Sequence, residues 1–252
     1  MKSFQEIQSS YLAKIDAGFS HAIGEQFQKN SAIREMLNYH YNTGGKRLRP
    51  LASIFVAKAL APQISDSEIL PVAIAVEMIH NATLIHDDIQ DGDEMRRSQP
   101  TLWKKYSLAQ GINCGDILFF SALQLVQEAP LAADLKLSLL KLFQEKTRFV
   151  IEGQVSEFTL KEKLQEQISS LAEYESMAQG KTAALFSLPI LAGALLAGAD
   201  EKKIINLEAG AAALGLAFQI QDDLLDLWGE KGRMEKGSDI AEGKLSYPVV
   251  CA

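Results

Sequence analysis

Two clusters of aspartates have the residue types and the spacing of a metal site. Their sequences are DDIQD at 87–91 and DDLLD at 222–226, and in each the first and last carboxylates are four residues apart. On a helix this spacing places both carboxylates on one face, where like charges repel unless a cation lies between them. Mg²⁺ prefers carboxylates together with water and phosphate oxygens. The predicted metal ligands are Asp87, Asp88, Asp91, Asp222 and Asp226.

Several groups of cations supply the complementary charge. The segment GGKRLRP at 44–50 places three cations at a predicted helix start, where free backbone N–H groups favour an anion. Arg96 and Arg97 closely follow the first aspartate cluster, and Lys181 and Lys244 add further positive charge. Ordinary surface salt bridges are the simpler interpretation, but they leave a basic double-glycine turn unexplained in an acidic chain. We therefore predict a phosphate-binding site.

Helices must position these groups, because strand signals are almost absent. No stretch alternates with a period of two, and no Asn-Gly or Asp-Gly turn joins two β-branched runs. The apolar spacing predicts helices near 4–29, 46–61, 67–91, 106–128, 131–160, 164–179, 181–198 and 201–228. The third and the last of these are apolar on most faces, as in central buried helices, and both lead into an aspartate cluster. The sequence has no linker or repeat and predicts one all-α domain over residues 1–252.

Composition narrows the functional class and the location. The 252 residues carry a net charge of −7 and two cysteines, which disfavours nucleic-acid binding and a disulfide framework. The N-terminus lacks the apolar region of a secretory signal, so we expect a cytoplasmic protein. The apolar stretch 183–199 is slightly short for a membrane span and contains Pro189, so we expect a buried core helix there and no stable membrane insertion.

The ordered set of motifs resembles the trans-isoprenyl diphosphate synthases of the polyprenyl synthetase family. The matching motifs are GGKRLRP at 44–50, DDIQD at 87–91, RRSQPT at 96–101, Gly153-Gln154, Lys181-Thr182, QIQDDLLD at 219–226 and EGK at 242–244. The resemblance implies an isoprenoid-synthase-type bundle of about ten helices around a deep central cavity. It also implies a homodimer that condenses an allylic diphosphate head to tail with isopentenyl diphosphate. Family members usually continue past Tyr247-Pro248, so we expect this chain to lack the last C-terminal helices.

The resemblance also implies a role for each matching residue. The aspartate clusters would hold Mg²⁺, three ions per active site, on the diphosphate leaving group of the allylic substrate. Thr182 and Gln219 would lie near the allylic cation, and the departing diphosphate would be the base. The residues expected to act in catalysis are Asp87, Asp88, Asp91, Arg96, Lys181, Thr182, Gln219, Asp222, Asp223, Asp226 and Lys244. Those expected to bind substrate are Lys46, Arg49, His80 and Arg97 for isopentenyl diphosphate, with Gln154 and Lys236.

Some positions depart from the family pattern or bear on the product. Ser98 stands where the family usually has glycine, and Lys236 is displaced by two residues from the expected lysine. Small residues before the first cluster, Ala82 and Thr83, and the short DDIQD form favour a geranylgeranyl or longer product over farnesyl. Two aromatic residues on a neighbouring helix, Phe119 and Phe120, could still form the floor of the cavity.

Three other functions are considered. A class I terpene cyclase would share the first aspartate cluster but would not need GGKRLRP or the arginine pair. A non-catalytic partner subunit of a prenyl synthase should have lost aspartates, and both clusters are intact. A di-iron bundle would need two Glu-x-x-His pairs, and the sequence 77–80 is the only one. The synthase is therefore the favoured function.

Overall fold

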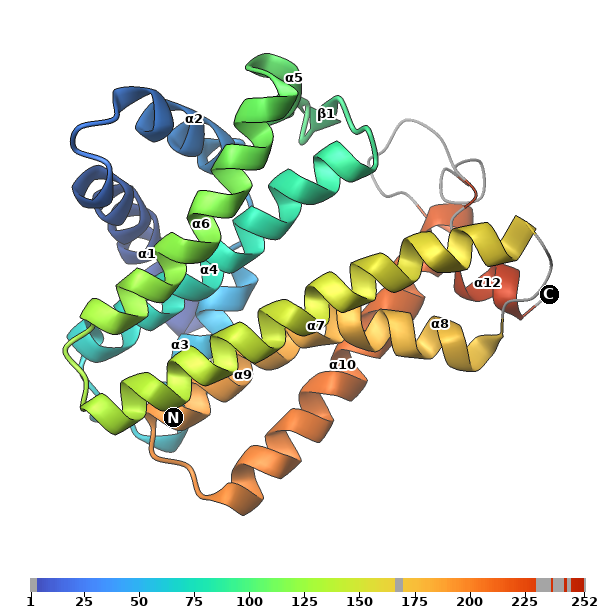
Figure 1. Ribbon diagram of the computed structural model, residues 1–252. Coiled ribbons are helices and arrows are strands. Elements are labelled where there is room, and N and C mark those ends of the chain that lie inside the picture. The colour runs from blue at the N-terminus through green and yellow to red at the C-terminus, as the bar shows by residue number, and fades with distance from the viewer. Residues whose placement is uncertain (1–3, 166–169, 230–236, 238–242, 244–245, 252) are drawn as a thin grey trace. The chain divides into compact units, whose positions relative to one another are not determined.

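The computed structural model describes residues 4–251 apart from 166–169, 230–236, 238–242 and 244–245 (Figure 1). Nearly all of the described chain is helical, which confirms the all-α prediction. The chain divides into two compact units, one made of Met1–Lys141 with Leu191–Asp200 and the other of Leu142–Ile190 with Glu201–Ala252. The first aspartate cluster belongs to the first unit and the second cluster to the second unit.

Helix α4 organises the first unit. This unit contains α1 (Phe4–Gln26), α2 (Ser31–Asn42), α3 (Leu48–Leu60), α4 (Asp66–Gln90), α5 (Leu102–Lys105), α6 (Leu108–Glu128), the start of α7 (Ala133–Gln165) and the end of α9 (Ala184–Leu196). Helix α4 packs against α1, α3, α5 and α6, and its Ile69, Val72 and Ile85 side chains are at most 1% exposed. A capping box starts the helix, because Ser65 Oγ accepts from Glu68 N while the Glu68 carboxylate accepts from Ser65 N.

Two glycines let α6 lie close to the last turns of α4, as the side-by-side ribbons in Figure 1 indicate. A Cβ atom at Gly115 would come within 2.2 Å of the His86 ring, and one at Gly111 would come within 2.7 Å of Ile89. A side chain at either position would therefore displace His86 or Ile89. The two glycines leave room for these side chains at the helix end that carries the first aspartate cluster.

Helix α2, the short helix α5 and a two-stranded hairpin of the first unit were not expected from the sequence. Helix α2 occupies 31–42, where no helix was predicted, and it starts at Asn30, whose side chain accepts a hydrogen bond from Ile33 N at 3.1 Å. A two-stranded hairpin, β1 (Met95–Arg96) and β2 (Gln99–Pro100), follows the first cluster in the gap between the predicted helices 67–91 and 106–128, where no strand was predicted. Its turn residues Arg97 and Ser98 both have positive φ, 52° and 63°.

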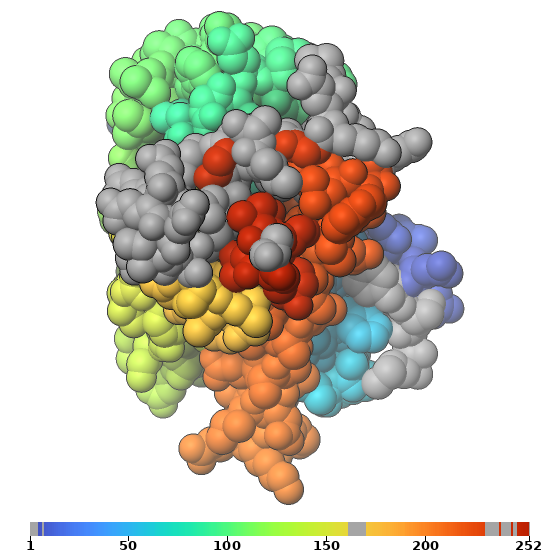
Figure 2. Space-filling view, turned by 90° about the vertical axis from the view of Figure 1, so that its right-hand side faces the viewer, coloured from blue at the N-terminus to red at the C-terminus, as the bar shows by residue number. Residues whose placement is uncertain are grey.

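The second unit is built around α10. It contains the rest of α7, α8 (Leu171–Ala178), the π-helix η1 (Gln179–Ala183), the start of α9, α10 (Glu201–Trp228) and α12 (Tyr247–Val250). Gly215 of α10 lies against η1, since a Cβ atom there would be 2.4 Å from the Ala183 Cα atom. Figure 2 shows α12, in red, against α8 and α10, and its Tyr247 and Val250 pack on a small core around Tyr174.

In the part of the chain that the structure describes, three helical stretches are long and apolar enough to cross a membrane by length and composition alone. They are Asp66–Gln90, Leu171–Leu196 and Glu201–Trp228. Of the most apolar window in each, 67%, 61% and 11% respectively is buried inside the protein. The burial of the second stretch agrees with the interpretation of 183–199 as a core helix.

Candidate active site

The first aspartate cluster occupies the last turn of α4. Asp87 and Asp88 lie in the helix, and Asp91 is its C-cap residue, with its backbone N–H donating to Asp87 O at 2.8 Å. Asp88 is almost fully buried, and Arg96 of β1 binds its Oδ1 atom through Nε at 2.6 Å and Nη2 at 2.5 Å. Arg96 Nη2 also lies 3.8 Å from Asp87 Oδ2. The predicted association of Arg96 with this cluster therefore takes the form of an ion pair with its middle aspartate.

Burial and charge act in opposite directions on the Asp88 carboxyl. Desolvation raises its pKa to about 6, although the hydrogen bonds and charge of Arg96 lower it. The same pairing raises the pKa of Arg96 against the effect of its own burial. The negative charge of the Asp88 carboxylate therefore depends on its ion pair with Arg96.

Hydrogen bonds from Trp103 connect the segment of the β1–β2 hairpin to the C-terminal end of α4. Trp103 Nε1 donates to the carbonyl oxygens of Asp88 at 3.0 Å and Asp93 at 2.9 Å, and Thr101 Oγ1 donates to Asp93 O at 2.8 Å. These bonds fix the segment that carries Arg96 and Arg97.

The basic turn 44–50 lies in the same unit and near the same arginines. Gly44 and Gly45 adopt φ values of 107° and 143°, which glycine tolerates best. A Cβ atom at Gly45 would be only 3.2 Å from Arg97 Nη1, so the missing side chain lets that guanidinium approach the turn. Lys46 is exposed to solvent. The structure thus brings the turn and Arg97 together, as the sequence predicts.

Arg49 and His80 form a second contact within this basic group. Arg49 Nη1 lies 3.2 Å from His80 Nε2. Burial, followed by the charges of Arg49 and Arg97, holds the pKa of His80 well below its usual range, so the ring is neutral. Since arginine only donates, Nε2 must accept and Nδ1 must carry the proton. The buried Nδ1 has no hydrogen-bond partner, which leaves one donor available to a ligand.

Nearby arginines also lower the pKa values of neighbouring groups, in addition to the larger effect of burial. Burial lowers the pKa of His40 to about 3, with further lowering by Arg96, Arg97 and Arg47. The pKa of Arg97 is lowered by burial and by its arginine neighbours. Several cations held this close together favour binding of a multiply charged anion.

The chemistry of the first cluster fits a divalent cation. The buried Oδ2 atom of Asp88 has no hydrogen-bond partner, and Asp87 and Asp91 add hard oxygen donors on the same turn. Within the described residues, no three His, Cys, Asp or Glu side chains are arranged so that they could hold a metal ion by themselves. A cation bound by these carboxylates would therefore need further oxygen ligands, such as water.

In the second unit, the predicted Lys181 and Thr182 lie on the π-helix η1. π-Helical turns are rare and often mark functional sites. Gly153 of α7 allows this turn to approach, since a Cβ atom there would be 2.1 Å from Lys181 N. Lys181 Nζ forms an ion pair with Glu157, a residue that the sequence analysis missed. The signal was present as an acidic residue one helical turn after Gly153.

A chain of hydrogen bonds joins Thr182 to the second aspartate cluster. Thr182 Oγ1 donates to Gln219 Oε1 at 2.5 Å, and Gln219 Nε2 donates to Asp223 Oδ1 at 2.8 Å. The other oxygen of Asp223 accepts from Tyr174 Oη and from Tyr247 N, both at 2.7 Å. All of these donors are uncharged. Among the described residues, Asp223 thus accepts hydrogen bonds from three neutral groups, one of which is the Gln219 amide.

The remaining predicted site residues take different positions. Asp226 is buried and Asp222 is partly exposed, four residues apart on α10. Gln154 lies on α7, and its buried Nε2 atom has no hydrogen-bond partner. Lys236 and Lys244 lie outside the described residues.

Comparison with known proteins identifies the family. The polyprenyl synthetase profile matches residues 30–252. The chain belongs to the polyprenyl synthetase family. It is 35% identical to the short chain isoprenyl diphosphate synthase of Methanocaldococcus jannaschii, over 96% of this chain and 71% of that protein. Other relatives are named farnesyl and geranylgeranyl diphosphate synthases.

Solved structures of the family share the fold. A geranylgeranyl pyrophosphate synthase aligns with a TM-score of 0.88 and 31% identity, over 99% of this chain and 73% of that chain. A polyprenyl synthase of Caulobacter crescentus, complexed with calcium and isoprenyl diphosphate, aligns with a TM-score of 0.84 and 34% identity, over 99% and 74% of the two chains. The isoprenoid-synthase fold is thereby confirmed, and the chain is a prenyltransferase of this family.

The family motifs account for the predicted site residues but not for the residues that hold them in place. Trp103, Glu157 and Tyr174 hold site residues in place but belong to no motif that the sequence analysis used. Each acts through a partner distant in sequence. For Trp103 and Tyr174, only the three-dimensional structure reveals these contacts.

Proposed function

We propose that this family member condenses isopentenyl diphosphate head to tail with an allylic diphosphate, releases diphosphate and requires Mg²⁺. The proposal treats residues 1–252 as one polyprenyl synthetase domain. One observation carries it: the first unit holds both an oxygen-rich aspartate cluster and a separate group of closely spaced cations. Two diphosphate substrates need two such sites, whereas a terpene cyclase binds only one diphosphate.

Isopentenyl diphosphate would bind the basic group. Lys46 and Arg49 supply charge from either side of a helix start, and Arg97 supplies it from the hairpin turn. His80, neutral and with a free Nδ1 donor, would add a hydrogen bond without adding charge. Gln154 and Lys236 remain proposed substrate contacts. Holding this substrate still makes its double bond a positioned nucleophile.

The allylic diphosphate would bind the aspartate clusters. Bound Mg²⁺ would neutralise the charge that develops on the leaving diphosphate. Arg96, Lys181 and Lys244 would add positive charge there. The proposed ligands are the same five aspartates, with Asp223 acting through Gln219.

The allylic cation needs dipoles but no nucleophile beside it. Thr182 donates its hydrogen to Gln219, so its oxygen lone pairs can face positive charge. Both groups are held by the hydrogen-bond chain to Asp223, which limits the motion that would let water in. The departing diphosphate would then take the proton released in the last step.

The product is proposed to be geranylgeranyl diphosphate, with farnesyl or a longer chain as alternatives. Ala82 is fully buried on α4, and neither it nor Thr83 carries an aromatic ring. Of the two phenylalanines on α6, Phe119 lies beside His86 with ring centroids 5.7 Å apart, whereas Phe120 is 72% exposed. Phe119 is therefore the better candidate for a floor that limits chain length.

We also propose a cytoplasmic homodimer that does not insert into membranes. Leu108, Ile112 and Phe120 on α6 are 54%, 44% and 72% exposed, and the exposed Asp116 lies between them. Large apolar side chains exposed on one helix make that helix a candidate surface for a partner. Light scattering of the purified protein tests the dimer, and a Phe120→Glu variant should shift it towards monomer.

The activity is tested with purified protein, Mg²⁺, isopentenyl diphosphate and dimethylallyl, geranyl or farnesyl diphosphate. Products are dephosphorylated and identified by mass, with an EDTA control. Elongation that needs Mg²⁺ is expected, with a C20 alcohol as the longest abundant product. Cyclic hydrocarbon from a single allylic substrate would instead indicate a terpene cyclase. Folded protein that elongates nothing would contradict the proposal.

A further inference from the structure

Arg47, the middle cation of GGKRLRP, has a role different from that of its two neighbours. We propose that Arg47 does not touch substrate but is a positioning residue, which locks the turn 44–49 so that Lys46 and Arg49 face isopentenyl diphosphate. This inference rests on the proposed function, and it adds a residue that the substrate-binding set does not include.

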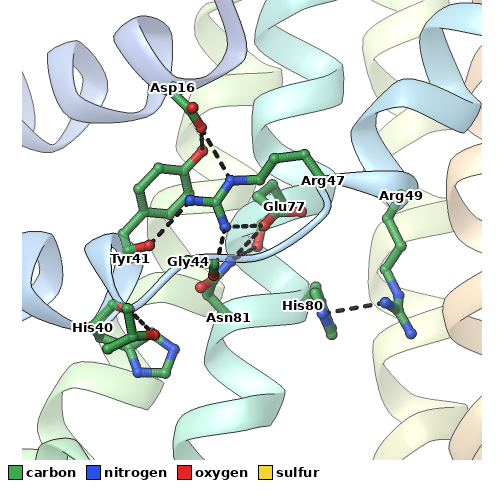
Figure 3. A network of polar contacts seen from close by, with 10 residues as sticks. Asp16, His40, Tyr41, Gly44, Arg47, Arg49, Glu77, His80 and Asn81 are labelled. Atoms are coloured by element: carbon green, nitrogen blue, oxygen red, sulfur yellow. Dashed lines mark hydrogen bonds and ion pairs between the residues drawn. The ribbon is translucent and has the colours of Figure 1, made fainter. Parts of the chain in front are cut away.

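The Arg47 side chain is buried and its guanidinium is almost fully used. Its side chain is 7% exposed. Nε donates to Asp16 Oδ1 at 3.0 Å, and Nη1 donates to Glu77 Oε1 at 3.3 Å (Figure 3). The guanidinium carbon also lies 3.6 Å from the centre of the Tyr41 ring. Two acids therefore neutralise this cation, and little of its charge is available to a diphosphate.

The remaining donors bind the backbone of the turn itself. Nη1 donates to Gly44 O at 3.1 Å, and Nη2 donates to Tyr41 O at 3.0 Å. Tyr41 lies in the last turn of α2, where carbonyl groups need partners. One side chain thus ties together the end of α2, the glycine turn and, through Asp16 and Glu77, helices α1 and α4.

The backbone at Arg47 is itself strained. Its φ of 50° and ψ of 34° are left-handed values, rare for a residue with a side chain, and it is the N-cap residue of α3. Such a conformation persists only where surrounding contacts enforce it. The side-chain bonds of Arg47 supply that enforcement, and α3 begins at the next residue, Leu48, with Arg49 as its second residue.

The side chains of Arg47 and Arg49 extend towards different groups. In Figure 3 the Arg47 side chain extends towards Asp16 and Tyr41, whereas that of Arg49 extends towards His80. Lys46 is exposed. If the Arg47 bonds were lost, the turn could relax to right-handed values and both neighbouring cations would move.

The first test is Arg47→Lys, which keeps the charge but cannot make four bonds in a plane. We expect the KM for isopentenyl diphosphate to rise about tenfold, while the KM for the allylic diphosphate stays within about twofold. The matched control is Arg148→Lys, since Arg148 is 61% exposed and pairs with Glu152 on the same helix. An unchanged KM for isopentenyl diphosphate, or an equal rise for both substrates, would overturn the proposal.

A second variant separates positioning from direct contact and is safer for folding. Asp16 has a side chain that is 47% exposed, so Asp16→Asn should fold. A positioning role predicts weaker binding of isopentenyl diphosphate, by about threefold, because the Arg47 anchor is loosened. Direct contact predicts the reverse, because Arg47 would gain free charge. Unchanged or tighter binding would therefore refute positioning.

Calorimetry of isopentenyl diphosphate binding distinguishes failure of the positioning role from failure of the proposed synthase activity. Wild-type protein that binds this ligand but does not elongate would contradict the synthase activity alone. Wild-type and Arg47→Lys proteins that bind it equally well would contradict the positioning role alone. Thermal melting of each variant confirms that the compared samples are folded.

Discussion

The two aspartate clusters have the same spacing but their middle residues are held in different ways. Asp88 is buried against one charged partner, Arg96, and one of its oxygens has no hydrogen bond. Asp223 is equally buried, but it accepts hydrogen bonds from Tyr174, Gln219 and a backbone N–H, all uncharged. The same motif therefore uses an ion pair in one unit and a neutral hydrogen-bond network in the other.

This difference predicts different sensitivities. A buried carboxylate that relies on one ion pair depends on pH and on that single partner. A carboxylate held by several neutral donors loses only part of its support when one donor is removed. The outer aspartates, in contrast, should be equivalent if both clusters bind metal.

The largest expected effect is therefore shared by the two clusters. Asp87→Ala and Asp222→Ala should each lower kcat by about a thousandfold, because each removes a proposed metal ligand. The measurement is steady-state elongation at saturating Mg²⁺. Asp134→Asn, an exposed carboxylate outside the site, serves as the control. A large loss in one variant only would show that the clusters do not act as a pair.

The next largest expected effect is a pH dependence of the free energy of unfolding, which involves the first cluster alone. The pKa of Asp88 is about 6 in the folded protein and 3.8 as its ordinary value, so the folded state binds the proton more tightly. Protonation therefore stabilises the fold, and the free energy of unfolding should fall by about 3 kcal/mol as pH rises from about 3 to about 7. Urea unfolding of wild type and Asp88→Asn across this range measures the difference. Parallel curves for the two proteins would refute the raised pKa.

A smaller effect tests the neutral network of the second cluster. Tyr174→Phe removes one buried hydrogen bond to Asp223 and should lower the free energy of unfolding by about 2 kcal/mol. Tyr106→Phe is the matched control, since the Tyr106 hydroxyl donates to Glu35 at the surface at 3.1 Å. Equal losses in both variants would argue against a special role for Tyr174.

The smallest expected effect is a change in stability at the β1–β2 hairpin, which places Arg96 beside Asp88. Ser98 has a φ of 63°, and Ser98→Gly should raise the free energy of unfolding by about 0.5–1 kcal/mol by relieving that strain. Ser98→Ala keeps the side-chain restriction and should give no gain. Thermal unfolding of both variants distinguishes strain relief from loss of the hydroxyl group.

The sequence was most informative where hydrophobic periodicity is long and uninterrupted. Helix α10 begins and ends where predicted, at 201 and 228. Helix α2 was missed because its 12 residues are mixed, with tyrosine, histidine and asparagine among few aliphatic side chains. The β1–β2 hairpin was missed because its turn uses two residues with side chains at positive φ, where glycine would be the usual signal.

For the site, the sequence could supply residue types but not their partners. GGKRLRP presents Lys46, Arg47 and Arg49 as three similar cations. Their different surroundings depend on Asp16 and Glu77, each about thirty residues away and on another helix. Nothing in local spacing distinguishes a buried arginine from an exposed lysine in such a turn. Long-range packing decides that question, and only a structure contains it.

The bond from Tyr247 N to Asp223 has a consequence for sequence divergence. A backbone N–H is present in every amino acid except proline, so nearly any residue at 247 could preserve this contact. A substitution at position 247 that removes a side-chain contact therefore leaves this bond between the C-terminal segment and the second cluster in place. Substitutions at this position should therefore keep the bond to Asp223 in every case except proline, even where they lose the packing of the Tyr247 ring on Tyr174.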